Sequence, residues 1–133
     1  MIVDTSALVA ILRYEPERLP FAQLLDQAEN LCMSAGSYLE LSIVIDSRKD
    51  AALSREIEEL IERFAIEIEP VTAEQARVAR QAYRDYGRGS GHPANLNFGD
   101  CFSYALARAK REPILFKGAD FGFTDLSPAI RIP

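Results

Sequence analysis

The chain has 133 residues, of which 48% are hydrophobic and 26% are charged, and its formal net charge is −5. This length and composition predict one globular domain, spanning residues 1–133, that buries about two thirds of its unfolded surface. The acidic balance argues against a broad, non-specific grip on nucleic acid, although it leaves open a nuclease whose metal ions neutralise phosphate locally. The single histidine excludes a multi-histidine metal site.

The sequence carries no sign of membrane insertion or export. No apolar run approaches the roughly 18 residues of a membrane span, and no basic segment precedes an apolar core as in a signal peptide. We therefore expect a cytoplasmic protein with no membrane partner. Cys32 and Cys101 form no CxxC pair, which predicts two small core residues in a reducing compartment.

Short apolar runs alternate with helical patterns along the chain. Strands are predicted at residues 2–3, 31–33, 65–71 and 114–116, with a last edge strand at 130–132. Helices are predicted after Thr5, over about 17–29, after Ser37, over 51–63, after Thr72 and around Asp100. This alternation predicts an α/β fold with a parallel sheet and right-handed crossovers. Pro70 favours an edge position for the third strand.

Four acids stand where strands end or helices begin. Each has an ordinary explanation, because such acids cap helices or complement the helix dipole. The carboxyl ends of parallel strands, however, share one edge of the sheet, and capping does not require four acids to converge there. A carboxylate cluster without a basic partner is repulsive unless a cation is supplied, and Mg²⁺ prefers oxygen ligands. The acids are Asp4, Glu40, Asp100 and Asp120, and the hydroxyls of Thr5 and Ser6 follow the first of them.

Basic residues offer a second signal. The helix after Thr72 has a predicted core face made of Ala76, Ala79, Tyr83 and Tyr86. Beside that face lies a stripe that either follows an RNA backbone or forms a solvated flank partly paired with acids, made of Arg77, Arg80, Arg84 and Arg88. Lys117 either contacts phosphate or extends from the core edge to water. His92, in a flexible loop at 88–95, is expected to be exposed and not catalytic.

Several stretches of the chain resemble the motifs of a known family. They are M-I-V-D-T-S-A-L at 1–8, S-A-G-S-Y-L-E at 34–40, N-F-G-D-C-F-S-Y-A-L-A at 97–107, I-L-F-K-G-A-D-F at 114–121 and T-D-L at 124–126. In this order, and over nearly the whole chain, they resemble PIN-domain proteins, specifically VapC-type toxins of bacterial type II toxin–antitoxin pairs. Residues 51–91 carry no motif of that family.

The resemblance implies a three-layer α/β/α sandwich with a short central parallel sheet and an endoribonuclease that depends on Mg²⁺ or Mn²⁺. It also implies a cognate VapB-like antitoxin and a homodimer. Metal in such a site activates water and offsets charge on the phosphate. The implied catalytic and metal-binding acids are Asp4, Glu40, Asp100 and Asp120, with Asp125 as a further ligand and Thr5 or Ser6 as hydroxyl support. Transfer RNA, ribosomal RNA and messenger RNA all stay open as substrates.

Two alternatives of other classes stay open. In a phosphatase or receiver-like domain, Asp4 is a phosphoryl-accepting nucleophile, although the dehalogenase-like pattern wants an acid two residues later, where Ser6 stands. The other alternative is a non-catalytic interaction module with the same fold. Measuring metal binding separates these alternatives, because a chain that binds no metal would be the non-catalytic module. The apolar helices at 8–21 and 39–45 exceed what one small core needs, which favours surfaces for protein partners.

Overall fold

The computed structural model describes residues 1–131 of the chain. Four short parallel strands form the central sheet, in the order β3-β2-β1-β4. They are β1 (Ile2–Val3), β2 (Cys32–Ser34), β3 (Glu67–Glu69) and β4 (Ile114–Leu115). β1 is central, because Ile2 pairs with Cys32 on one side and with Ile114 on the other. All strands run the same way, so their carboxyl ends meet at one edge of the sheet.

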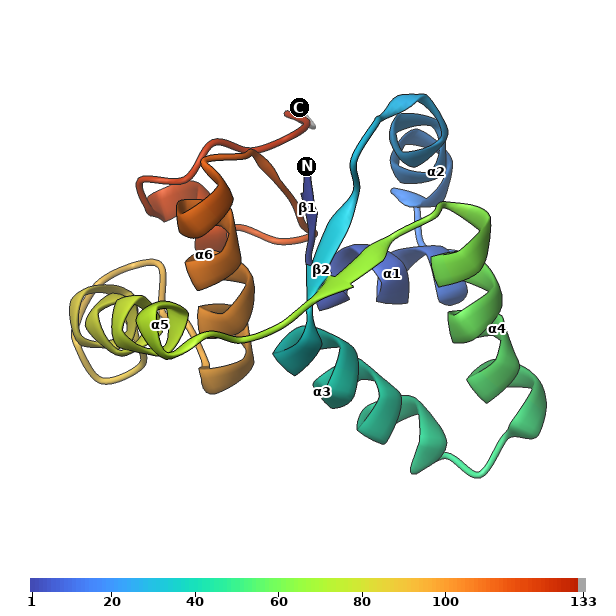
Figure 1. Cartoon of the computed structure of the whole chain (residues 1–133), viewed down its shortest axis with the longest axis horizontal. Coiled ribbons are helices and arrows are strands. Elements are labelled where there is room, and N and C mark those ends of the chain that lie inside the picture. Colours follow the sequence, from blue (N-terminus) through green and yellow to red (C-terminus); the bar gives the residue numbers. More distant parts are fainter. Residues whose placement is uncertain (132–133) are drawn as a thin grey trace.

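Helices cover both faces of this sheet (Figure 1). On one side lie α1 (Thr5–Leu12), α2 (Arg18–Gln27), α3 (Ala35–Asp46) and α4 (Ala51–Arg63). On the other side lie α5 (Ala73–Tyr86) and α6 (Phe98–Lys110), and a short 3₁₀ helix, η1 (Asp120–Phe123), follows β4. The expected three-layer α/β/α sandwich with a central parallel sheet is confirmed.

Two apolar cores hold the three layers together. Consecutive strand residues point to opposite faces of a sheet. Val3 and Leu115 accordingly pack into the core beneath α1 to α4, whereas Ile2 and Ile114 pack into the core beneath α5 and α6. Cys32 lies in the second core, and both cysteines are buried and free, as expected.

Several strand boundaries differ from the sequence-based prediction. β2 begins one residue later than expected, and β3 is shorter than 65–71, although its edge position is confirmed. The strand expected at 130–132 was wrong for Ile130 and Arg131, which have no strand geometry, and Ile132 lies outside the described residues. The segment at Pro128 instead forms one isolated parallel bridge to Ile114, so the outer edge of β4 is already occupied before Ile130.

The face of α5 that enters the core differs in part from the prediction. Tyr86 packs into the second core as predicted, together with Val78 and Ala82, whereas Ala76 and Tyr83 are exposed. Both faces are apolar at helical spacing, so periodicity alone could not tell which one contacts α6. His92 is half-buried where an exposed ring was expected, because it packs edge-on against Tyr86 with the ring centroids 4.8 Å apart.

In the described part of the chain, no helix combines the length and the apolar character needed to cross a membrane.

Candidate active site

Asp4 lies directly after β1 and caps the N-terminus of α1. Its side chain is held from two directions, although the residue is only 4% exposed. Oδ2 accepts hydrogen bonds from the Ser6 backbone N–H at 3.0 Å and from Ser6 Oγ at 2.6 Å, while Oδ1 accepts one from Ser103 Oγ at 2.6 Å. Ser6 Oγ in turn accepts the Lys117 backbone N–H at 2.9 Å. The carboxylate is therefore oriented jointly by α1, by α6 and by the segment after β4.

Glu40 reaches the same place from α3. A Cβ atom added to Gly99 would lie 2.5 Å from both the carboxyl carbon and Oε1 of Glu40. The Glu40 carboxylate thus fills the space that a side chain at position 99 would need, directly against the first turn of α6. A glycine at this position allows the two helices to bring their acids together.

Asp100 is fixed by a reciprocal cap at the start of α6. Asn97 Oδ1 accepts the Asp100 backbone N–H at 2.8 Å, and Asp100 Oδ2 accepts the Asn97 backbone N–H at 2.9 Å. This capping box satisfies two backbone donors and holds the acid at the helix N-terminus. Asp100 therefore lies in the first turn of its helix, as the sequence predicted, and it also caps that helix.

The four acids are close enough to perturb one another. Burial raises the pKa of Asp100 to about 6, opposed by the Asn97 backbone hydrogen bond and assisted by the charges of Asp4, Asp120 and Glu40. Burial and the charge of Asp4 also raise the pKa of Glu40. Within residues 1–131, none of the ion pairs includes any of these four acids. The cluster is therefore a repulsive group of carboxylates with no internal counter-charge.

By chemistry, this group of oxygen donors suits a hard divalent cation, although within residues 1–131 no three of the four acids bring their ligand atoms within 4.8 Å of one another. Mg²⁺ binds through carboxylates, hydroxyls and water, and a cation would offset the neighbouring charges that add to the effect of burial on the pKa of Asp100. The side chains that would hold the ion are Asp4, Glu40, Asp100 and Asp120. Asp120, in η1, is exposed to solvent.

Replacing Asp100 with asparagine is expected to stabilise the metal-free protein. A difference of one in pKa is worth about 1.4 kcal/mol, and the pKa of Asp100 rises from 3.8 to about 6. The charged form therefore costs on the order of 3 kcal/mol, and the melting temperature should rise by about 10 °C. The folded pKa lies above the ordinary value of 3.8, so the carboxylate lowers stability as pH rises through about 6. Thermal melts should therefore show the gain at pH 8 and lose it below pH 4.

Two comparisons make the Asp100→Asn measurement specific. Glu29→Gln removes an exposed acid that belongs to none of the ion pairs within residues 1–131, and its melting temperature should stay unchanged. Mg²⁺ should stabilise the wild type more than the Asp100→Asn variant, because binding to the folded state raises stability. An Asp100→Asn melting temperature below that of the wild type at pH 8 would contradict the repulsive cluster.

Two buried serines complete the site and were missed from the sequence. Ser37 and Ser103 are fully buried, and their Oγ atoms are 3.0 Å apart. Ser103 lies three residues after Asp100, and Ser37 lies three residues before Glu40, so helical spacing places each serine on the same face as its acid. That spacing was the available signal. Thr5 points instead toward α3, with Oγ1 donating to the Ser37 carbonyl at 3.4 Å.

The structure does not bring Asp125 to this cluster. Its Oδ1 accepts a hydrogen bond from the Tyr104 hydroxyl at 2.7 Å, and its Oδ2 pairs with Arg108 Nη1 at 2.7 Å. Tyr104 and Arg108 lie one and two turns beyond Asp100 along α6. Asp125 therefore ties the segment after η1 to the far part of α6, a different arrangement from the further metal ligand that the resemblance implied.

Lys117 also has local partners. Its Nζ pairs with Glu15 and lies 3.2 Å from Glu17 Oε2, and these hydrogen bonds raise the pKa of the lysine. The ammonium group thus links the segment after β4 to the connection between α1 and α2. Its backbone N–H, and not its charge, is the group that reaches the site, through Ser6.

The arginine stripe is open to solvent. None of its members takes part in an ion pair within residues 1–131. The alternative in which these arginines pair with nearby acids is therefore not supported. The exposed members are Arg77, Arg80 and Arg84 on α5 and Arg88 just after it.

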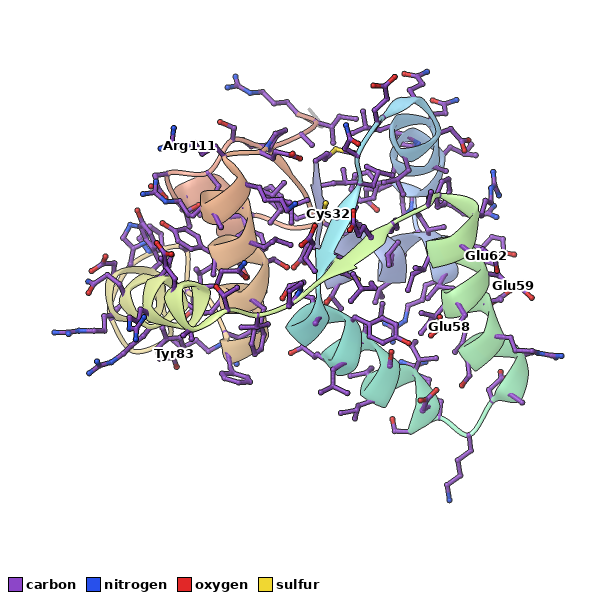
Figure 2. The ribbon with its side chains drawn as sticks, viewed as in Figure 1. Cys32, Glu58, Glu59, Glu62, Tyr83 and Arg111 are labelled. Atoms are coloured by element: carbon purple, nitrogen blue, oxygen red, sulfur yellow. The ribbon has the colours of Figure 1, made fainter. Side chains whose placement is uncertain are left out.

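A second group of potential ligands lies elsewhere in the sheet. Oxygen and sulfur atoms of Cys32, Glu67 and Glu69 fall within 4.8 Å of one another, across the pairing of β2 with β3. Figure 2 shows Cys32 on the central strands. Lys110 Nζ already pairs with Glu69 Oε1 at 2.8 Å, and burial raises the pKa of the Cys32 thiol. This arrangement is distinct from the four-acid cluster and carries its own counter-charge.

Comparisons with known proteins agree with the fold and the motifs. Residues 1–125 match the model of the PIN domain. The chain is 57% identical over 130 residues to "Ribonuclease VapC28" of Mycobacterium tuberculosis, with 98% of each chain covered. It is 51% identical over 129 residues to "Ribonuclease VapC42" of the same species, covering 97% of this chain and 98% of that one.

Solved structures share the architecture. Mycobacterium tuberculosis VapC20, described as a sarcin–ricin loop cleaving toxin, superposes with a TM-score of 0.68 at 20% identity, over 96% of this chain and 98% of that one. The FitAcB structure from Neisseria gonorrhoeae gives a TM-score of 0.69 at 18% identity, over 96% and 94%. These likenesses show the fold, and the near full-length sequence matches show the family. The chain belongs to the PIN-domain family and, within it, to the VapC ribonucleases.

Proposed function

We propose that this protein is an endoribonuclease toxin that hydrolyses RNA phosphodiester bonds at the cluster of Asp4, Glu40, Asp100 and Asp120, using Mg²⁺ or Mn²⁺. The observation that carries the proposal is the convergence of these four acids: burial raises the pKa of Asp100 to about 6, and the charges of Asp4, Asp120 and Glu40 add to that rise. Relatives that are 57% identical over nearly the whole chain are named ribonucleases, which supports RNA as the substrate.

Each part of the site has a defined task in this proposal. A divalent ion, when bound, supplies activation of water and offsets charge on the phosphate. The chain itself holds the ligands in place: Ser6 and Ser103 orient both oxygens of Asp4, and Asn97 orients Asp100. Partners of this kind typically change metal affinity or activity by about 10- to 100-fold when removed.

Cleavage of purified RNA with and without metal tests the proposal. The wild-type chain should cut RNA with Mg²⁺ or Mn²⁺, stop when a chelator is added, and recover when metal is restored. Mapping the cut sites on total RNA would then identify the substrate among transfer, ribosomal and messenger RNA. If the chain neither cleaves RNA nor binds Mn²⁺ in titration calorimetry, the non-catalytic module is favoured. A trapped aspartyl-phosphate at Asp4 would favour the phosphatase.

We also propose a VapB-like antitoxin and a homodimer as partners. A toxin–antitoxin complex from Klebsiella pneumoniae is among the similar structures, with a TM-score of 0.66 at 15% identity over 90% of this chain and 88% of that one. On α3, three apolar side chains are exposed, which agrees with the surplus expected at 39–45: Leu39, Ile43 and Val44. The surplus expected at 8–21 is confirmed only in part: Leu8 and Phe21 are fully buried, whereas Tyr14 and Leu19 are exposed.

Light scattering and co-expression test these partners. The purified chain should have twice the mass of one chain, and Leu39→Ser with Ile43→Ser should reduce it to a single chain. The antitoxin should suppress cleavage, with an arginine entering the acidic cluster because a guanidinium matches carboxylates in a bidentate fork. A neighbouring gene product that does not relieve toxicity would count against the antitoxin.

The arginine stripe should hold the RNA backbone. Replacing Arg80 and Arg84 with glutamine is expected to weaken binding of all RNAs alike, because phosphate contacts position nucleic acid without reading its sequence. The salt dependence of binding should flatten by roughly one counterion per lost contact, as measured by affinity at several salt concentrations. Arg48→Gln with Arg55→Gln, two exposed arginines outside the stripe, is the matched control and should change neither quantity. If the stripe variant keeps the wild-type affinity and salt dependence, these arginines do not contact RNA and form only a solvated flank of the helix.

A further inference from the structure

An apolar groove of about 360 Å³ lies between α5 and α6. Tyr83 of α5 and Phe98, Cys101 and Phe102 of α6 line it. Figure 2 shows Tyr83 on the lower side of α5, the side away from Arg111. This volume lies within the range of small-ligand pockets. The groove is therefore large enough for one aromatic ligand and is not used by the four-acid cluster.

The groove exposes aromatic rings that packing alone does not explain. Phe98 is 76% exposed and Tyr83 is 42% exposed, although the opposite face of α5 is well packed. The Phe98 and Phe102 rings meet edge to face with their centroids 5.1 Å apart, so Phe98 stands on a fixed support. A contiguous exposed apolar surface of this kind marks a binding site in a folded monomer.

The groove borders the acidic cluster through shared backbone. Phe98 and Cys101 flank Asp100 in the first turn of α6. The Phe102 ring packs against Gly36, where an added Cβ would lie 2.5 Å from Phe102 Cγ, and Gly36 stands in the first turn of α3 that leads to Glu40. A molecule that extends from the groove along α6 therefore meets the carboxylates directly.

The charges around the groove are cationic. Arg80 and Arg84 are exposed and line it, and neither takes part in an ion pair within residues 1–131. Flat apolar surfaces beside unpaired guanidinium groups suit single-stranded nucleic acid, in which bases stack on aromatic rings while cations follow the phosphates. An apolar helix of a protein partner would cover the rings as well, but it would need acidic residues placed opposite both arginines.

We propose that the α5–α6 groove binds one unpaired base of the RNA next to the bond that is cleaved, stacked on Phe98 and Tyr83. Arg80 and Arg84 contact the phosphates that flank this base. The inference rests on the proposed ribonuclease function and adds to it the element that selects the cleavage position. Specificity then comes from a base that leaves its own stack, so the enzyme acts on loops and other single-stranded segments.

The test uses Phe98→Ala and Tyr83→Ala, two changes of exposed side chains. With the RNA that the wild type cleaves, each variant should lower kcat/KM by about 10- to 100-fold, chiefly through KM, because stacking on an aromatic ring is lost. Cut sites mapped on total RNA should spread to further sequences. Tyr14→Ala and Phe123→Ala, exposed aromatic residues outside the groove, are the controls and should behave as wild type.

A binding measurement separates this inference from the proposed function. Short single-stranded RNA carrying a fluorescent purine analogue should be quenched by the wild type without added metal, and less so by Phe98→Ala. If the wild type cleaves RNA while both variants keep its KM and cut sites, the groove does not bind a base and the ribonuclease proposal stands. If no RNA is cleaved, quenching that depends on Phe98 still supports the groove, and absent quenching overturns it. A change of oligomeric state or antitoxin affinity in the variants, with unchanged RNA kinetics, assigns the groove to a protein partner and overturns the proposal.

Discussion

Replacing Asp4 with asparagine should abolish RNA cleavage while the fold survives. The variant removes a charge that a divalent ion requires, and loss of several kcal/mol of charge stabilisation corresponds to roughly a 10³-fold or larger fall in rate. The cap on α1 is kept, because asparagine caps helices as well as aspartate does. Ser103 can accept a hydrogen bond from the new amide and donate to Ser37, so the buried pair stays satisfied.

A matched control isolates the metal role from the capping role. Asp50 caps α4 as Asp4 caps α1, with Oδ1 accepting the backbone N–H groups of Ala52 and Leu53, but it lies outside the cluster. Asp50→Asn should leave cleavage and Mn²⁺ binding unchanged. Cleavage rates, calorimetric Mn²⁺ titration and thermal melts of both variants would decide the matter. Full activity in Asp4→Asn would sink the assignment of Asp4 as a metal ligand.

Gly99→Ala should uncouple stability from activity. The new methyl group would collide with the Glu40 carboxylate, which is the mobile end of a long side chain and can move away. Alanine is also favoured over glycine in a helix by about 1 kcal/mol, so the melting temperature should not fall. Displacement of a reacting group by about 1 Å costs on the order of 10²-fold in rate, and we expect a loss of that size in kcat.

Gly122→Ala serves as the control for the Gly99 variant. A Cβ atom at Gly122 meets nothing within 4 Å, although this residue stands in η1 beside the site. Its activity should stay close to that of the wild type. A Gly99→Ala protein that is as active as Gly122→Ala would show that the position of Glu40 does not matter for cleavage, whereas a large drop in melting temperature would show that the backbone moves instead of the carboxylate.

The layers of the fold could be predicted from the sequence because their signals are local. Ile2 and Val3 form a strand buried on both faces, and the apolar periodicity of α4 and the cap at Thr72 mark helices. Boundaries were less certain, since β2 and β3 are held by pairing across the sheet and not by their own residues. The face of α5 could not be chosen, because two apolar stripes compete and only contact with α6 decides between them.

The convergence of the four acids could be anticipated, whereas their supports could not. The edge of a parallel sheet indicates where Asp4 and Asp120 lie, and the first turn of α6 fixes Asp100, whereas Glu40 lies in the second turn of α3, one turn later than the sequence predicted. Ser103 appeared in the sequence as one residue of a buried helix, and only its hydrogen bond to Asp4 reveals what it does. The partners of Asp125 and Lys117 depend on the path of the chain after β4, where no periodic pattern exists to guide a prediction.

The central place of β1 sets the order in which the protein becomes active during its own synthesis. β1 pairs with β4 as well as with β2, so the strand that emerges first from the ribosome waits for one of the last segments to be made. Asp120 follows β4, and the backbone at Lys117 holds Ser6 against Asp4. An incomplete nascent chain therefore lacks Asp120, one of the proposed ligands, and the support of Asp4, another of them. A toxin built in this way acquires its acidic centre only once translation has passed β4, which delays the hazard to the RNA of the cell that makes it.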